Sequence, residues 1–205
     1  MTEVAQRAQL TRDTIVRAAV EMIERDGEES VSMRRIAAEL RYGVMSLYNH
    51  VPSKEALLDA VAEQVIADFD FTSDPTADWR DQARALVHSF RAMSLRYPRC
   101  LNVIVGRQLN SSAGLQPIEA ALATARLAGF DGAMAVRVMR IFVSYVYGST
   151  HHEAQLGRAR GDVHADPARF PNVADLGDHL VHPDPDTDFE FGLELLIAAV
   201  GALPR

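Results

Sequence analysis

The sequence is almost free of cysteine, since Cys100 is the single thiol among 205 residues. One cysteine excludes a disulfide framework, and it excludes any zinc site that needs two or more thiolates. Cys100 lies in an apolar run, where a free thiol behaves as a small hydrophobe, so we expect it to be buried. This cysteine usage fits a reducing, cytoplasmic compartment.

Long hydrophobic runs are also missing. The most apolar stretches are interrupted by Arg137, Arg140 or Glu194 before they reach the about 18 residues that a membrane-spanning helix needs. The first residues, MTEVAQRAQLTRD, contain no apolar segment of the kind found in signal peptides. We therefore expect neither a membrane span nor a membrane partner.

Positive charge is not in excess, because 21 basic residues stand against 28 acidic ones, for a net charge of -7. This balance argues against a protein that grips nucleic acid with its whole surface. The acidic excess lies outside residues 1–54, which contain eight basic and eight acidic side chains. Charge is therefore distributed asymmetrically between the two ends of the chain.

Helical periodicity is what the sequence does contain, over most of its length. Thr11, Ser32 and Ser53 are suitable N-caps for three of the helices. A polar loop is expected at 70–78, and a long one at 157–188 with one helical turn near 173–180. No segment has the pattern of a strand, so the predicted fold class is all-α. The expected helices span residues 12–25, 33–40, 44–50, 54–69, 79–96, 100–107, 115–128, 132–153 and 189–202.

The short helices 33–40 and 44–50, joined by a three-residue turn and preceded by a longer helix, form a helix-turn-helix. This spacing alone is a weak signal, because many helical hairpins share it. The residues add specificity. The segment SMRRIAAELRYGVMSLYNHVPSKEALLDAV resembles the DNA-binding domain of the TetR (tetracycline repressor) family of bacterial regulators. The final FEFGLELLI is similar to the last helix of the subgroup around the tetracycline repressor itself.

The resemblance implies two domains: a helix-turn-helix domain at residues 1–54, and a helical bundle at 55–205 for ligand binding and dimerisation. The helix at about 54–69 would connect them. The implied function is that of a ligand-responsive regulator, expected to be a repressor. Such a homodimer binds palindromic double-stranded operator DNA and is released by a small apolar or aromatic inducer. No enzyme is expected. A small-molecule carrier without a DNA role is the alternative, but it gives no reason for the pattern of residues 1–54.

DNA contacts are expected from the third helix, whose small or polar side chains let its backbone approach base edges in the major groove. Val44 and Met45 are suited to contact a thymine methyl group. By the resemblance, residues at the start of helix 33–40 and just after the third helix lie where the family grips phosphate. The predicted DNA-binding residues are Ser32, Arg34, Val44, Met45, Ser46, Tyr48, Asn49, His50 and Lys54.

Neighbouring residues have other interpretations. Leu47 is expected in the core of the small domain, and Tyr48 could cap that core instead of binding phosphate. Arg35 fits a solvated surface charge better than a DNA contact. Arg7 and Arg12 could reach flanking phosphates or a minor groove.

The turn departs from the family pattern, which has glycine directly after the leucine that corresponds to Leu40. Here Arg41 stands in that place, and Tyr42 replaces a small apolar residue. We expect Arg41 to adopt a left-handed conformation, at a cost of about 1 kcal/mol, unless the turn differs locally.

The C-terminal bundle offers apolar and polar groups that could line a ligand site, although each could equally be core packing. In tetracycline-binding members a histidine helps to ligate magnesium, and Ile104 stands in its place here, so a metal–tetracycline inducer is not expected. Neither a cofactor nor a metal site is expected, because the adjacent His151 and His152 point to different helix faces. The predicted ligand-binding residues are Phe90, Met93, Ile104, Gln108, Phe142, Tyr145 and His151.

Dimerisation is expected through the helices at about 132–153 and 188–202. The first of these is apolar on most sides, so it needs wide burial in a core or against another chain. Two copies of both helices make a four-helix interface, and the two-fold axis presents two recognition helices to a palindromic site.

Overall fold

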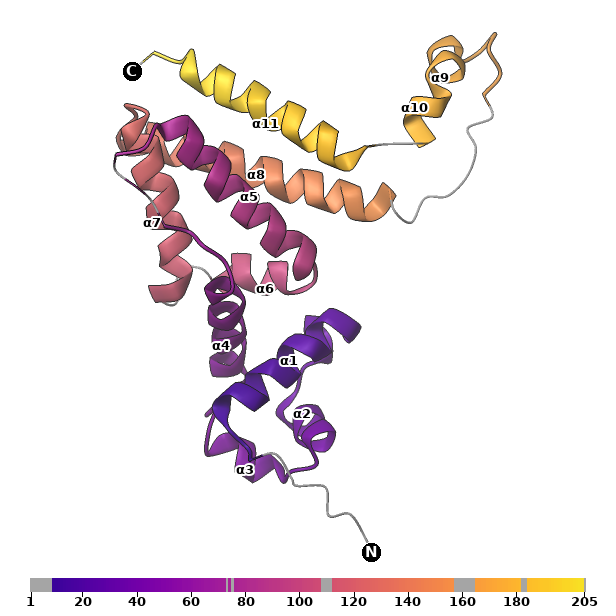
Figure 1. The fold of residues 1–205 in the computed structure, drawn as a ribbon. Helices are drawn as coiled ribbons and strands as arrows, with labels where there is room; N and C mark the ends of the chain where they lie inside the picture. The colour runs from indigo at the N-terminus through magenta and orange to yellow at the C-terminus, as the bar shows by residue number, and fades with distance from the viewer. Residues whose placement is uncertain are drawn as a thin grey trace, which may run out of the picture. The chain divides into compact units, whose positions relative to one another are not determined.

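The computed structural model describes residues 9–72, 74, 76–107, 112–156, 165–181 and 184–204. In this part of the chain every regular element is helical, which confirms the all-α prediction (Figure 1). None of its helices is long and apolar enough to cross a membrane. The elements are α1 (Arg12–Asp26), the 3-10 turn η1 (Glu28–Ser30), α2 (Met33–Leu40), α3 (Val44–Tyr48), α4 (Lys54–Ala67), α5 (Trp79–Arg96), α6 (Cys100–Arg107), α7 (Ser112–Leu127), α8 (Gly132–Leu156), α9 (Pro171–Asp175), α10 (Gly177–Val181) and α11 (Pro185–Gly201).

The helices form two compact units. One combines Met1–Thr72 with Ala92–Glu119, and the other combines Ser73–Arg91 with Ala120–Arg205. The first unit therefore holds α1 to α4 together with α6, and the second holds most of α5 with α8 to α11. The predicted boundary at residue 54 separates a DNA-binding domain from a ligand-binding domain, whereas these two units are defined by compactness, so that boundary stays a prediction.

Local caps explain why the first helices begin where they do. The Thr11 hydroxyl accepts a hydrogen bond from the Thr14 backbone N–H, and the Thr14 side chain accepts one from Thr11 N–H. Ser32 caps α2 and Ser53 caps α4 by the same kind of bond. These three N-caps were predicted, and they satisfy backbone donors that the first turn of a helix leaves free. Behind them, the apolar stripes of α1 and α4 are buried.

Helix α6 packs against α4 and α1 inside the first unit. The Glu24 carboxylate accepts hydrogen bonds from the backbone N–H groups of Arg99 (3.1 Å) and Cys100 (2.7 Å), so a side chain of α1 caps α6. At the other end of α6, Arg107 donates to Asp59 of α4 at 2.6 Å. Cys100 is buried as predicted, and burial raises the pKa of its thiol.

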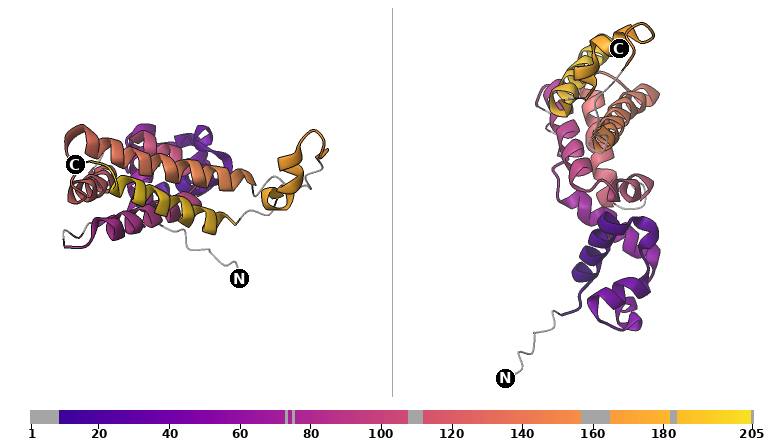
Figure 2. Two further views of the ribbon diagram at one scale, coloured as in Figure 1. Left: turned by 90° about the horizontal axis from the view of Figure 1, so that it is seen from above. Right: turned by 90° about the vertical axis from the view of Figure 1, so that its right-hand side faces the viewer.

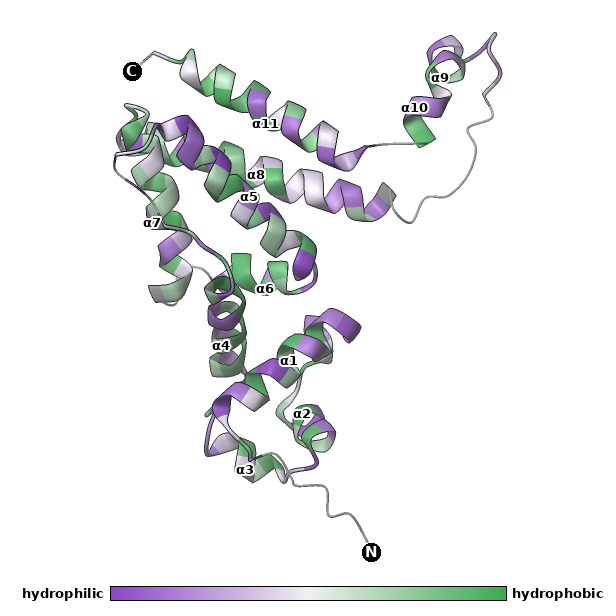
Figure 3. Ribbon diagram, in the orientation of Figure 1, coloured by the Kyte–Doolittle hydropathy of each residue, from purple (hydrophilic) through white to green (hydrophobic). Residues whose placement is uncertain are grey.

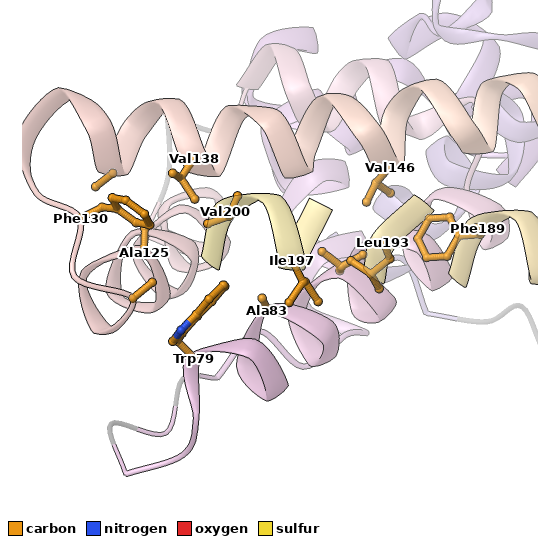
Figure 4. Close-up of a cluster of buried hydrophobic side chains, with 13 residues drawn as sticks. Trp79, Ala83, Ala125, Phe130, Val138, Val146, Phe189, Leu193, Ile197 and Val200 are labelled. Atoms are coloured by element: carbon orange, nitrogen blue, oxygen red, sulfur yellow. The ribbon is translucent and has the colours of Figure 1, made fainter. Parts of the chain in front are cut away.

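In the second unit, α5, α8 and α11 enclose one hydrophobic cluster. Trp79 and Ala83 come from α5, Val138 from α8, and Leu193 and Ile197 from α11 (Figure 4). Helices α8 and α11 run side by side in both views of Figure 2. Figure 3 shows that hydrophobic residues concentrate in the C-terminal half of α11.

Several element boundaries differ from the predictions. Helix α3 ends at Tyr48, because Asn49 and His50 form a turn before Pro52. Helix α7 begins at Ser112 and contains Pro117.

The end of the expected loop 157–188 was wrong. Asp184 caps α11 by accepting from Thr187 N–H, and Pro185 occupies its first position, so the helix starts four residues before Phe189. The expected turn near 173–180 is present as α9 and α10. The loop's residues 157–164, with His164, lie outside the described residues, as does His182.

Candidate DNA-binding surface and ligand-binding core

The turn between α2 and α3 is closed by a residue in the left-handed conformation. Arg41 has φ 58° and ψ 39°. Tyr42 N–H donates to Ala37 C=O at 2.9 Å and Arg41 N–H donates to Ala38 C=O at 3.1 Å. This pair of bonds is a Schellman motif, in which glycine is the usual left-handed residue. The expected left-handed conformation of Arg41 is confirmed.

Helix α3 shows one buried and one exposed side. Leu47 is completely buried, as predicted, and it holds the helix to the core of the first unit. Met45 is 75% exposed, the largest value among the exposed large hydrophobic residues. Tyr48 is 42% exposed, which favours a surface role over the alternative of a core cap. Asn49 and His50 are exposed too, whereas Val44 and Ser46 are half-buried.

The basic residues of this region fall into two groups. Arg25 forms ion pairs with Glu39 (3.0 Å) and Asp26 (3.2 Å), and Arg35 pairs with Asp26 at 2.9 Å. Arg35 is therefore a surface charge engaged by the protein itself. Arg12 and Arg17 are also paired, with Glu63 and Asp13.

The second group consists of basic side chains that no acidic side chain of the described residues engages. Among the described residues, Arg34 and Lys54 have neither an ion pair nor a side-chain hydrogen bond. Both were predicted as DNA contacts. Ser32 is half-buried and its hydroxyl already caps α2. Arg7 lies outside the described residues.

The ion-pair network between α1 and α2 is ionised at neutral pH. Hydrogen bonds from Arg25 lower the pKa values of both Asp26 and Glu39 below their ordinary range. The same bonds raise the pKa of Arg25. Its four charged side chains are thus committed to holding α2 against α1.

The predicted ligand-binding residues divide between the two units. Phe90, Phe142 and Tyr145 pack against the hydrophobic cluster of the second unit and are only partly buried. His151, in the same unit, is exposed. Met93 and Ile104 are buried in the first unit, and Gln108 lies outside the described residues. The structure therefore groups three of the seven candidates.

Arg91 and Phe189 join this aromatic group, and the sequence analysis missed both. The guanidinium carbon of Arg91 lies 4.5 Å from the centre of the Phe189 ring. The only sequence signal was the position of Arg91 directly after Phe90. The ring of Phe189 also lies 5.2 Å from that of Tyr145, whose hydroxyl donates to Phe189 C=O at 2.7 Å.

Two carboxylates hold the Arg91 guanidinium. Its Nη2 lies 3.1 Å from Glu153 Oε2 and 2.7 Å from Asp186 Oδ1. Burial lowers the pKa of Arg91, but the hydrogen bonds to Asp186 and Glu153 outweigh burial and raise it. Arg91 is therefore a charged group inside a largely apolar surround, with only 12% of its side chain exposed.

No cluster of three or more histidine, cysteine or acidic side chains in the described ranges has the arrangement of a metal site. His151 and His152 are both exposed.

Comparisons with known proteins agree with this geometry. A family model described as "Bacterial regulatory proteins, tetR family" matches residues 15–61, and one described as "Tetracyclin repressor-like, C-terminal domain" matches residues 72–203. The chain is 29% identical to the HTH-type transcriptional repressor DrrR1 of Streptomyces coeruleorubidus, over 95% of this chain and 78% of that protein. It is 31% identical to an HTH-type transcriptional regulator of Saccharopolyspora erythraea, over 94% of this chain and 85% of that one.

A solved structure shares the fold over nearly the whole chain. It is the TetR family protein ActR of Streptomyces coelicolor in complex with (S)-DNPA, with a TM-score of 0.75 and 26% identity. The match covers 94% of this chain and 98% of that one.

Proposed function

The chain belongs to the TetR family of bacterial regulatory proteins, and on that premise we propose how it reads DNA and what releases it. The protein is a ligand-responsive transcriptional repressor and not an enzyme. It binds operator DNA as a homodimer and responds to a small-molecule effector. A carrier without a DNA role is not favoured, because residues 15–61 of this chain match the family model of bacterial regulatory proteins. We place this activity in the cytoplasm.

The DNA-reading surface that we propose is the exposed side of α3 with its two flanking cations. The observation that carries it is the sorting of charges: Arg34 and Lys54 have no partner among the described residues, while Arg25 and Arg35 hold α1 and α2 together. Unpaired cations at the edges of a recognition helix suit phosphate. Met45, exposed at the centre, suits an apolar contact such as a thymine methyl group.

This surface is tested with DNA from immediately upstream of the protein's own coding sequence. Fluorescence anisotropy over a salt series should give an affinity whose logarithm falls linearly with the logarithm of salt. Lys54→Ala should weaken binding on all sequences alike. Val44→Ala and Ser46→Ala should change the preference between bases, each by about 1–3 kcal/mol.

Arg17→Ala is the matched control, because Arg17 is paired with Asp13 on the outside of α1. It should leave affinity and salt dependence unchanged. If the double variant of Arg34 and Lys54 to alanine bound DNA like the wild type at physiological salt, the proposed docking would be wrong.

The effector site that we propose is the partly buried aromatic group of Phe90, Phe142 and Tyr145 in the second unit. Apolar and aromatic side chains with few polar groups are typical of small-molecule sites. ActR has been solved with the small molecule (S)-DNPA bound. For this chain we propose an apolar or aromatic effector, and no metal, since Ile104 stands where the resemblance places a magnesium-binding histidine.

Release of DNA requires that the effector bind the DNA-incompetent state more tightly. A coupling of about 1–3 kcal/mol shifts affinity by about 5–150-fold, and reciprocity demands that operator DNA weaken effector binding by the same factor. The test uses an aromatic compound that stabilises the protein. Calorimetry should give a lower affinity for this compound in the presence of operator DNA than in its absence. Equal affinities with and without operator would refute induction through this site.

A further inference from the structure

One polar atom in the aromatic group lacks a partner. The Nε of Arg91 is buried and finds no hydrogen-bond acceptor among the residues that the structure describes. Leaving a buried donor unsatisfied is costly, and for a charged group the cost is larger than for a neutral one. The two carboxylates do not relieve it, because both contact Nη2 instead.

The surroundings of this donor are aromatic. The carbon of the Arg91 guanidinium lies 4.5 Å from the centre of the Phe189 ring, and the centre of the Tyr145 ring lies 5.2 Å from that of the same ring. Tyr145 brings a hydroxyl to the group, but its proton is already donated to Phe189 C=O. Arg91 therefore supplies the buried donor that this group still has to offer.

We infer that Arg91 is the polar anchor of the effector site, and that the effector is a planar aromatic compound carrying a neutral acceptor oxygen, such as a ketone or quinone carbonyl. The inference rests on the proposed function and names the chemistry of its ligand. The planar ring packs against the partly buried side chains of Phe90, Phe142 and Tyr145, while the carbonyl oxygen accepts from Arg91 Nε–H.

Charge decides between a neutral and an anionic acceptor. Glu153 and Asp186 already neutralise Arg91. A third carboxylate is near, because His88 also packs against the Phe189 ring and its Nε2 lies 3.6 Å from Glu190 Oε2. A carboxylate ligand would add a further negative charge to a group in which acidic side chains outnumber the arginine. Like charges at short distance repel, and more strongly in a partly buried site.

A purely structural role for Arg91 makes a different prediction. If Glu153 turned its second oxygen to Nε, Arg91 would only tie α5 to α8 and α11. Its replacement would then lower stability, and it would not change which ligands bind.

The test compares three probes that share one tricyclic ring system: 9-fluorenone with a carbonyl, fluorene with a methylene group in its place, and 9-fluorenecarboxylate with an anion. Their affinities for the full-length protein are measured by calorimetry without DNA. A hydrogen bond to a charged group corresponds to a preference of about 10-fold or more. We expect fluorenone to bind at least that much more tightly than either of the other two.

Arg91→Lys keeps the positive charge for Glu153 and Asp186 but removes Nε–H, so it should abolish the preference for fluorenone over fluorene. Arg84→Lys is the matched control. Arg84 lies on the same helix and pairs with Glu194 of α11 through Nε at 2.6 Å, so it has no unsatisfied Nε. That variant should keep the preference.

A second measurement does not depend on any variant being folded. The Nε–H resonance of Arg91 in the wild-type protein should shift on addition of fluorenone and stay in place on addition of fluorene. Equal affinities of the two probes, no binding of fluorenone, a preference that survives Arg91→Lys, or an unmoved resonance would each overturn the inference.

The proposed function fails separately. Operator release by the same probes is followed by DNA anisotropy. Release without an Arg91-dependent preference leaves the regulator intact and removes the anchor. An Arg91-dependent preference without release keeps the anchor and removes induction through this site.

Discussion

Tyr145 lies so close to Gly192 that a Cβ atom at position 192 would clash with the tyrosine hydroxyl oxygen and sit 2.8 Å from its ring carbon Cζ. The absence of a side chain on this residue of α11 is what lets the ring of Tyr145 reach across from α8. The hydroxyl then meets Phe189 C=O at 2.7 Å. One glycine thus positions a residue of the proposed effector site.

We predict that Gly192→Ala lowers the free energy of unfolding by about 1–3 kcal/mol, the usual cost of overpacking a core. It should also weaken fluorenone binding, because Tyr145 must move. Gly106→Ala is the control, since no atom lies within 4 Å of a Cβ built there, so the helical alanine should stabilise by about 0.5–1 kcal/mol. Urea denaturation at fixed protein concentration gives both values. A Gly192→Ala protein as stable as the wild type would contradict the close contact.

The strained turn makes a second prediction. Arg41→Gly should raise the free energy of unfolding by about 1 kcal/mol, because glycine adopts φ 58° without the clash that other residues suffer. Arg41→Ala removes the same side chain but keeps the clash, so the difference between the two variants isolates the backbone term. Thermal denaturation measures both. Equal stability of the alanine and glycine variants would show that the left-handed conformation is not strained.

Arg34 and Arg35 are adjacent and should behave in opposite ways. Arg34→Ala should reduce the salt dependence of DNA binding by about one phosphate contact and leave stability unchanged. Arg35→Ala should lower stability, because it breaks the contacts to Asp26 (2.9 Å) and Ser30 C=O (3.0 Å), and it should leave the salt dependence unchanged. Anisotropy over a salt series and urea denaturation separate the two effects. If Arg34→Ala lowered stability and Arg35→Ala reduced the salt dependence, the proposal that Arg34 contacts DNA and Arg35 does not would be refuted.

Two leucines of α11 should separate assembly from folding. Leu195 is 56% exposed in the single chain, whereas Leu193 is completely buried. Leu195→Asp should abolish the homodimer but preserve the helical circular dichroism, because the charge falls on the expected interface and not in the chain's own core. Leu193→Ala should cost about 2–5 kcal/mol of stability. If analytical ultracentrifugation showed that the Leu195→Asp protein is still a dimer, the dimer interface would not include this face of α11.

The network around Arg25 predicts a dependence of stability on pH. Because the pKa values of Asp26 and Glu39 are lowered by folding, their contribution is present above the ordinary carboxyl pKa of about 4 and is lost as pH falls through the lowered values. Glu39→Gln should therefore be less stable than the wild type at pH 7, and the difference should shrink as the pH falls below the ordinary carboxyl pKa of about 4. Glu29→Gln, an exposed position outside the network, is the control. A difference that stays constant with pH would contradict the prediction.

The helices of the region matched by the regulator family could be predicted from the sequence, because the interactions that define them are local. A cap such as Thr11 or Ser32 bonds a residue three positions away, and the bonds around Arg41 span five residues at most. Helical periodicity then identified Leu47 as a core residue. The same rules predict a start at Phe189 for α11, which is wrong, because Asp184 caps the helix and Pro185 is its first residue.

The partners of the charged and aromatic side chains could not be predicted from the sequence, because they depend on how the helices pack. Arg35 and Arg34 look alike in sequence, but the position of Asp26 makes Arg35 a structural cation, whereas Arg34 has no ion pair among the described residues. Arg91 contacts Phe189 and Asp186, which belong to a helix about one hundred residues further along the chain. No periodicity of the sequence links residues so far apart. Such pairings follow from how the faces of α5, α8 and α11 pack, because the energy of a long-range contact depends on the folded arrangement and not on local sequence.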